Sequence, residues 1–351
     1  MAYTTIDLPT EYFNTTAYTG DGVVGRNLTT GIFQPDWVWI KSRSDADNHR
    51  LVDAVRGATK HLESDNDTAE QTSSNVTAFT PTGITLSSNG AVNANTETYV
   101  AWAWLGANST ASNTAGDITS TVSASTTSGF SIVSYTGNGT DNDTATIGHG
   151  LGVAPNFIIT KCRSEAGGWI SSSTSLGWNN VVSLNTTDAS SAGTQAFGVT
   201  GVTPSSITFT VSASSGGNHT NINNATYIAY CFAEKKGFSK AFSYTGNGSA
   251  DGVFTYCGFK PAFLLVKSTG ADNWCMLDNK RDTFNVMDKR LFPNLSNAES
   301  TGVPTVVDFV SNGFKLRTSD SSFNLNGQSF IGFAIAEHPF VTSTSVPTTA
   351  R

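Results

Sequence analysis

The pentapeptide YTGNG occurs at residues 135–139 and again at 244–248, and the variant YTGDG stands at 18–22. Asn-Gly favours a hairpin turn because both residues adopt positive φ at low cost. A single copy would predict only a turn. Three copies at near-regular spacing indicate an internal repeat, and the spacing is that of whole domains.

Three strand-like segments recur in a fixed order after each copy of this motif. The first begins with a proline six residues before a lysine, and proline fits the first residue of a strand because its missing N–H breaks no ladder bond. These proline-led segments are QPDWVWIKSR (34–43), APNFIITKCR (154–163) and KPAFLLVKST (260–269). The second set is GITL (83–86), SITF (206–209) and GFKL (313–316). The third set is TYVAWAW (98–104), TYIAYCF (226–232) and SFIGFAI (329–335).

We therefore predict an all-β protein built from three tandem homologous β-sandwich domains of jelly-roll-like type. The predicted domains span residues 1–105, 130–236 and 237–340. Residues 106–129 are expected to form a flexible connector in which ITSTVSA (118–124) could add one strand, and 341–351 a loosely held tail. A helical turn or two could lie in HRLVDAVRGATKHL (49–62), where Gly57 limits the length of any helix.

The first proline-led strand is apolar on both faces. Trp37 and Trp39 share one face, and Val38 and Ile40 share the other. Such a strand is either buried on two sides within its own domain or covers its second face with a neighbour. Trp102 and Trp104 in the segment at 98–104 leave the same two alternatives open.

Composition excludes several classes of protein. Charged residues make up 13% and the formal net charge is −7, so nucleic-acid binding has no electrostatic support. No stretch of 18 apolar residues predicts membrane insertion, and the start of the chain lacks the pattern of a secretory signal. The four cysteines, Cys162, Cys231, Cys257 and Cys275, form no C-x-x-C pair. Cys162 and Cys231 lie in apolar strand-like runs, where we expect buried free thiols, and the chain is expected to be made in a reducing cytoplasm.

No catalytic, metal-binding or cofactor-binding constellation stands out, and we expect a protein that is not an enzyme. The histidines are interpreted as solvated loop residues rather than metal ligands: His49, His61, His149, His219 and His338. Asp45, Asp47 and Asp53 lie in loops and do not recur as the carboxylate pair of a glycosidase. The segment GTDNDTATIGHG (139–150) lacks the oxygen pattern of a calcium loop.

Residues that do recur receive structural interpretations. A lysine that ends each proline-led strand could contact a ligand, but we favour a snorkelling side chain with its charge in water; the three are Lys41, Lys161 and Lys267. A repeated asparagine is expected to fix a turn through side-chain hydrogen bonds; the three are Asn95, Asn223 and Asn326. The tryptophans are read as core aromatics in preference to sugar-stacking platforms.

Taken together, YFNTTAYTGDG, FQPDWVWIKSRS, HRLVDAVRGATKHL, TYVAWAW, GFSIVSYTGNG, ATIGHGLGVAPNFIITK and TYIAYCFAE resemble a repeated β domain of tailed-bacteriophage virion structural proteins. Such proteins are often labelled tail fibres, especially in marine phages of cyanobacteria and related bacteria. The resemblance covers nearly the whole chain, and the third copy departs most from it. It implies a virion component that touches a host surface, with other virion proteins and a host glycan or protein as partners. A capsid decoration or capsid fibre protein and a carbohydrate-binding module stay open as alternatives.

Assembly has two alternatives. Tandem β domains with few charges leave sheet edges open to pairing, and closed symmetric assembly covers such edges. We expect a homo-oligomer, in the first place a trimer. Alternatively, one chain with three copies supplies a pseudo-threefold unit and needs no second chain.

Overall fold

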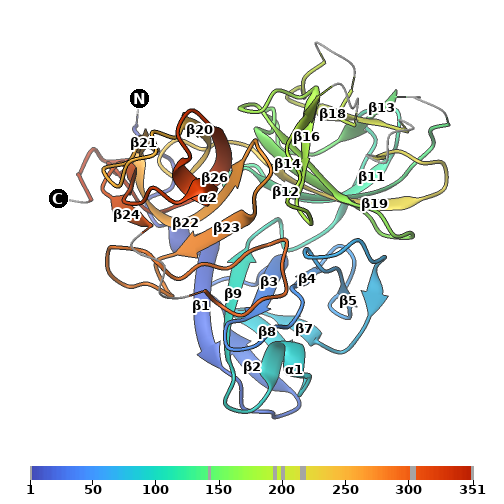
Figure 1. Ribbon diagram of the computed structural model, residues 1–351. Coiled ribbons are helices and arrows are strands. Elements are labelled where there is room, and N and C mark those ends of the chain that lie inside the picture. Colours follow the sequence, from blue (N-terminus) through green and yellow to red (C-terminus); the bar gives the residue numbers. More distant parts are fainter. Residues whose placement is uncertain are drawn as a thin grey trace.

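The computed structural model describes residues 2–140, 144–192, 196–198, 202–213, 219–300 and 306–348. Antiparallel strands dominate this part of the chain, which confirms the all-β class. Figure 1 shows three lobes around a shared centre, blue for the N-terminal part, green for the middle and orange to red for the C-terminal part. We call them lobe 1 (2–105), lobe 2 (106–236) and lobe 3 (237–348).

Each lobe contains a run of four large strands in one order, and the proline-led segment is always the third strand. In lobe 1 the strands are β1 (Phe13–Thr19), β9 (Thr98–Trp104), β3 (Trp37–Ser42) and β4 (Arg50–Asp53). In lobe 2 they are β12 (Phe130–Thr136), β19 (Thr226–Phe232), β14 (Phe157–Cys162) and β15 (Trp169–Ser173). In lobe 3 they are β20 (Ser239–Thr245), β26 (Ser329–Pro339), β22 (Phe259–Ser268) and β23 (Trp274–Asp278).

A smaller sheet packs on one face of each run and completes a sandwich. Lobe 1 has β2 (Arg26–Thr29), β8 (Gly83–Leu86) and β7 (Val76–Thr80); lobe 2 has β13 (Thr144–Gly148) and β18 (Thr208–Ser212); lobe 3 has β21 (Phe254–Tyr256), β25 (Gly313–Leu316) and β24 (Val307–Val310). The match predicted for SITF (206–209) is wrong by two residues. Phe209 is buried and pairs in β18, whereas Ile207 is 58% exposed. The alternation of buried and exposed side chains fixes which face of a strand is buried, and the similarity of residue types used for the prediction did not detect it.

The second face of each large run meets the other two lobes. One apolar cluster contains buried residues from all three, including Trp37, Trp102, Tyr230 and Phe263. The ring centroids of Trp37 and Tyr230 lie 4.2 Å apart, and those of Trp102 and Phe263 lie 6.1 Å apart. The tryptophans are therefore core residues, and the neighbouring lobe supplies the cover that a strand apolar on both faces requires.

The repeated pentapeptide holds the first strand against the last strand of each lobe. The Tyr18 ring stacks on Tyr99 at 5.2 Å, and its hydroxyl donates to the Val92 carbonyl at 2.7 Å. Tyr135 and Tyr244 make the same two contacts in the other lobes. The following glycine permits close approach of two backbones, because a Cβ on Gly20 would lie 2.0 Å from the Ala94 carbonyl oxygen.

Several connecting segments differ from expectation. The helical turn predicted at 49–62 is wrong, since this segment forms β4, a tight turn and β5 (Lys60–His61), which pairs with β6 (Gln71–Thr72). The connector forms β10 (Ala111–Asn113) and β11 (Ser120–Ser125), and β11 pairs with β12. Lobe 2 also has β16 (Asn180–Ser183) and β17 (Ser191–Ala192).

The helical elements are short. They are η1 (Pro9–Glu11), α1 (Gly90–Asn93) and α2 (Ser321–Asn324). None of the described helices is long and apolar enough to cross a membrane. The tail is held more firmly than predicted through residue 348, because Ser343 donates from its backbone N–H to Asp7 at 2.6 Å.

Candidate functional site

Three matching interfaces, which we call seams, join the lobes into a ring. The first seam joins lobes 1 and 2, the second joins lobes 2 and 3, and the third joins lobes 3 and 1. Each contains one equivalent backbone hydrogen bond: Glu70 N–H to the Arg163 carbonyl at 2.8 Å, Ser190 N–H to Thr269 at 2.9 Å, and Glu299 N–H to Arg43 at 2.8 Å. Because the contacts run from 1 to 2, 2 to 3 and 3 to 1, the ring closes within one chain.

Buried charge networks reinforce the first and third seams. Arg163 donates from Nε to Glu70 at 2.8 Å, and Arg43 donates from Nε to Glu299 at 2.9 Å. A buried arginine of the carboxylate's own lobe completes each network: Arg56 beside Glu70 and Arg281 beside Glu299. Burial opposes ionisation of Glu299, but its bonds from the two arginines outweigh burial and hold its pKa below the usual value. These carboxylates are structural.

Asp53 and its lobe 3 counterpart Asp278 extend the networks. Each is fully buried and paired with the arginine three residues later. Asp53 also accepts from the Tyr230 hydroxyl at 2.8 Å, and Asp278 accepts from Trp102 Nε1 at 3.1 Å. Both bonds cross a seam. The prediction of a solvated loop role for Asp53 is therefore wrong, because the turn after β4 points into the neighbouring lobe.

His49 is also a seam residue. Its Nδ1 accepts from Trp39 Nε1 at 2.8 Å, so Nε2 carries the proton and donates to the Phe292 carbonyl of lobe 3 at 3.0 Å. Burial lowers the pKa of His49 to about 3. At the equivalent position Trp169 donates to the Glu63 carbonyl at 2.7 Å, and Trp274 to the Ser183 carbonyl at 2.8 Å.

The prediction of solvated loop histidines fails for three of the five. His49, His61 and His149 are buried, while His338 is exposed and His219 is half-buried. Tertiary packing covers them, which local sequence could not indicate.

The repeated lysines do not snorkel. The side chains of Lys41, Lys161 and Lys267 are buried, and each ammonium donates to backbone carbonyls. Lys161 reaches across the first seam to the Asp67 carbonyl at 3.2 Å. Burial lowers the pKa of each lysine to about 8. Each ammonium takes carbonyl partners because a buried charge without hydrogen bonds is costly.

The asparagines that fix the pentapeptide turn lie two residues before those predicted. Asn93 accepts from the Asp21 N–H at 3.1 Å and donates to the Val23 and Ser87 carbonyls. Asn221 and Asn324 accept the equivalent bonds in lobes 2 and 3. Asn95, Asn223 and Asn326 are exposed at the same turns. The asparagine that fixes the turn is the buried one, and spacing alone did not reveal which of the two asparagines is buried.

Among the described residues, one acidic group has potential for cation binding. Carboxylate oxygens of Asp45, Asp47 and Glu97 lie within 4.8 Å of one another at the surface of lobe 1. An exposed acidic group of this kind is common in solvated loops, so we assign it no ion. The segment at 139–150 includes residues 141–143, which lie outside the described part of the chain. Cys162 and Cys231 are buried free thiols, as predicted, and Cys257 and Cys275 are buried free thiols as well.

A cleft with a volume of about 940 Å³ lies in lobe 3. It arises where lobe 3 departs from the other two copies. The loop from Arg281 to Leu291 is four residues longer than the equivalent loop from Arg56 to Leu62. The extra length carries Phe284, whose side chain is 83% exposed. Since lobes 1 and 2 fold without this insertion, the sandwich itself does not require it.

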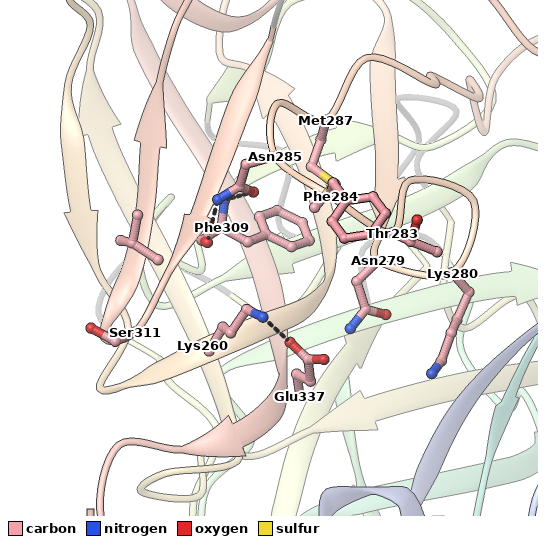
Figure 2. Close-up of a pocket in the computed structure, with 11 residues that line it drawn as sticks. Lys260, Asn279, Lys280, Thr283, Phe284, Asn285, Met287, Phe309, Ser311 and Glu337 are labelled. Carbon is pink, nitrogen blue, oxygen red and sulfur yellow. Dashed lines mark hydrogen bonds and ion pairs between the residues drawn. The ribbon is translucent and has the colours of Figure 1, made fainter. Parts of the chain in front are cut away.

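Figure 2 shows how the cleft combines apolar and charged groups. Phe284 projects over buried Met287 and Phe309. Across from them, Lys260 pairs with Glu337 at 2.7 Å. Asn285 fastens the loop to β24, because its side chain donates to and accepts from the Phe309 backbone at 2.9 Å. Lys280, Asn279, Thr283, Val310 and Ser311 complete the lining.

The cleft has the composition of a contact surface. An exposed aromatic ring beside polar and charged groups is typical of contact surfaces. Lys260 of β22 and Glu337 of β26 neutralise each other in the cleft. Sequence reasoning missed Phe284, Lys260 and Glu337, although the longer spacing from Arg281 to Leu291 could have indicated the insertion.

Fold and seams together define a class: an all-β protein in which three sandwich lobes close around one core. A family model described as a domain of unknown function, DUF7483, matches residues 8–339, and the chain belongs to this family. No curated protein and no solved structure matches the chain.

Proposed function

We propose that the chain is a non-enzymatic structural component of a tailed-bacteriophage virion, made in the bacterial cytoplasm, that contacts the host surface as a tail fibre does. The observation that carries this proposal is the use made of the reactive side chains. Buried His49, and the lysines and carboxylates that recur between lobes, bond across or beside the seams, as Lys161 and Glu299 do. These side chains hold the lobes together. The resemblance of the repeated motifs to virion proteins supplies the biological setting.

The closed ring supports the second assembly alternative, in which one chain acts as a pseudo-trimer. Seam contacts that would join three subunits join three lobes here, as the bond between Arg43 and Glu299 does. The apolar faces that would drive trimer formation already cover one another. Light scattering tests this: we expect a compact monomer at micromolar concentration, and a stable trimer would refute the proposed pseudo-trimer.

The cleft beneath Phe284 is proposed as the host contact. Mass spectrometry of purified particles first tests whether the protein is part of the virion, and we expect peptides of this chain in intact virions. Their presence only in the soluble lysate of infected cells would refute a structural role.

Binding of the fluorescently labelled chain to host cells tests the cleft. Phe284→Ala should abolish most binding without lowering the melting temperature, because its side chain is 83% exposed. Val24→Ala is the matched control, since Val24 is 73% exposed on lobe 1, away from the cleft. Equal binding by Phe284→Ala and Val24→Ala would contradict the proposal that the cleft is the host contact.

A further inference from the structure

The outer edge of the large sheet is used differently in lobes 2 and 3. In lobe 2 the connector covers this edge: β11 pairs with β12, with Thr121 opposite Ser134 and Ser123 opposite Ile132. The connector also reaches the small sheet, where Ile118 donates to the Thr146 carbonyl of β13 at 3.1 Å. One extended segment therefore bridges both sheets of that sandwich.

Lobe 3 presents the same edge without such a segment. β20 is the terminal strand of its sheet, and no strand of the described residues pairs with its outer edge. A pocket of about 360 Å³ runs between residues 240–244 of β20 and residues 254–256 of β21. By pairing register, Ser243 corresponds to Ser134 and Phe254 to Thr146. The pocket thus lies where the connector lies in lobe 2.

A second pocket continues this space into the second seam. It has a volume of about 580 Å³ and shares Ser175, Ser243 and Tyr244 with the first pocket. The residues that line it are uncharged, because Ser190 and Thr269 stand where Glu70 and Arg163 fill the first seam. The resulting groove is continuous and polar, and Lys240 is the one charged residue among those that line it.

We infer that this groove binds an extended segment of a partner protein, which adds a strand to β20. The chemistry of the segment follows from β11, whose sequence STVSAS is neutral and composed of small residues. An unpaired strand edge supplies backbone donors and acceptors, and side chains along the groove select the sequence. Exposed Phe254 and Tyr256 on β21 flank the entering strand, where lobe 2 has Thr146 and Gly148.

Contacts at the start of β20 define which part of the edge is open. Ser239 is bonded to Lys235, and the Ala241 N–H donates to the Glu234 carboxylate at 3.2 Å. A strand in the register of β11 would displace Glu234 and pair opposite Ala241 and Ser243. This inference goes beyond the proposed function and does not depend on where the protein is located.

A labelled peptide with the sequence of residues 117–125, DITSTVSAS, serves as the probe. We expect saturable binding to the full chain, with one peptide per chain, measured by fluorescence anisotropy. A peptide carrying Ser123→Pro is the control and should not bind, because proline removes an N–H needed for pairing. Absence of saturable binding at millimolar peptide, or equal binding of the control, would overturn the inference.

Two protein variants locate the site. Ser243→Pro should weaken binding at least about tenfold and leave the fold intact, since proline is tolerated on an edge strand where the N–H faces outward. Ser190→Glu with Thr269→Arg rebuilds the ion pair of the other seams and should narrow the groove with the same effect on binding. Both variants are checked for an unchanged melting temperature. Full binding by both variants, or binding of a neutral hexasaccharide in place of the peptide, contradicts strand addition.

Discussion

Removing Glu299 should open the third seam. Its carboxylate accepts two bonds from Arg43, at 2.9 and 2.8 Å, and one from Arg281 at 3.0 Å. Glu299→Ser places there the residue that the second seam has at Ser190, so the backbone tolerates the change. Breaking a buried ion pair on one side costs about 3–5 kcal/mol. Arg43 is partly exposed and Arg281 keeps Asp278, so we expect the lower end, about 3 kcal/mol.

The double variant Arg43→Thr with Glu299→Ser reproduces the neutral second seam. It removes both charges of the pair and should therefore cost less than Glu299→Ser alone, with a coupling free energy of at least about 1 kcal/mol. Urea unfolding gives the free energies, followed by tryptophan fluorescence and by circular dichroism so that coincident transitions establish two-state behaviour. The reasoning is refuted if Glu299→Ser costs less than about 0.5 kcal/mol, or if the cycle shows no coupling.

The same residue gives a pH dependence with a definite sign. The folded pKa of Glu299 lies below that of the unfolded chain, so its stabilisation is present above pH about 4.5. It is lost as the pH falls through the folded pKa, because the unfolded state then binds the proton first. The stability difference between the natural chain and Glu299→Ser should therefore shrink on acidification from pH 6 toward about pH 3.

Further predictions concern the lysines, the pentapeptide turn and the thiols. Because burial lowers the pKa of Lys161 to about 8, the unfolded chain binds more protons between about pH 8 and pH 10. Stability relative to Lys161→Met should rise with pH across pH 7.5–9, and a flat difference curve would contradict this. Gly137→Ala should lower the melting temperature, since a Cβ there lies 2.2 Å from the Ile222 carbonyl oxygen, whereas Gly90→Ala, with nothing within 4 Å, should not. Burial raises the pKa of the Cys231 thiol, so a thiol reagent should label it only on unfolding, and rapid labelling of the native chain would contradict its burial.

The large strands and their repetition follow from the sequence. Tyr18 and its two counterparts recur because the ring stacks on the last strand and the hydroxyl bonds to a carbonyl. Gly20 recurs because two backbones meet there. Pro35 does not begin the strand as predicted but stands two residues before β3, and the apolar run after it must be buried. These constraints act within one sheet and leave a pattern that any copy of the domain must show. Comparison of the three copies therefore predicted the all-β class and, apart from the shift of two residues at 206–209, the matched strands.

The packing of the lobes determines what covers the second face of each sheet. It also determines which partners the buried polar side chains find. Both faces of β3 are apolar, yet no local feature says whether a second sheet or a second lobe covers them. Glu70 and Arg163 are 93 residues apart, and their pairing depends on how whole lobes approach. The cleft beneath Phe284 and the groove beside β20 arise where one copy departs from the others, and the groove also needs the approach of lobe 2, which supplies Ser175 and Ser190 to its lining.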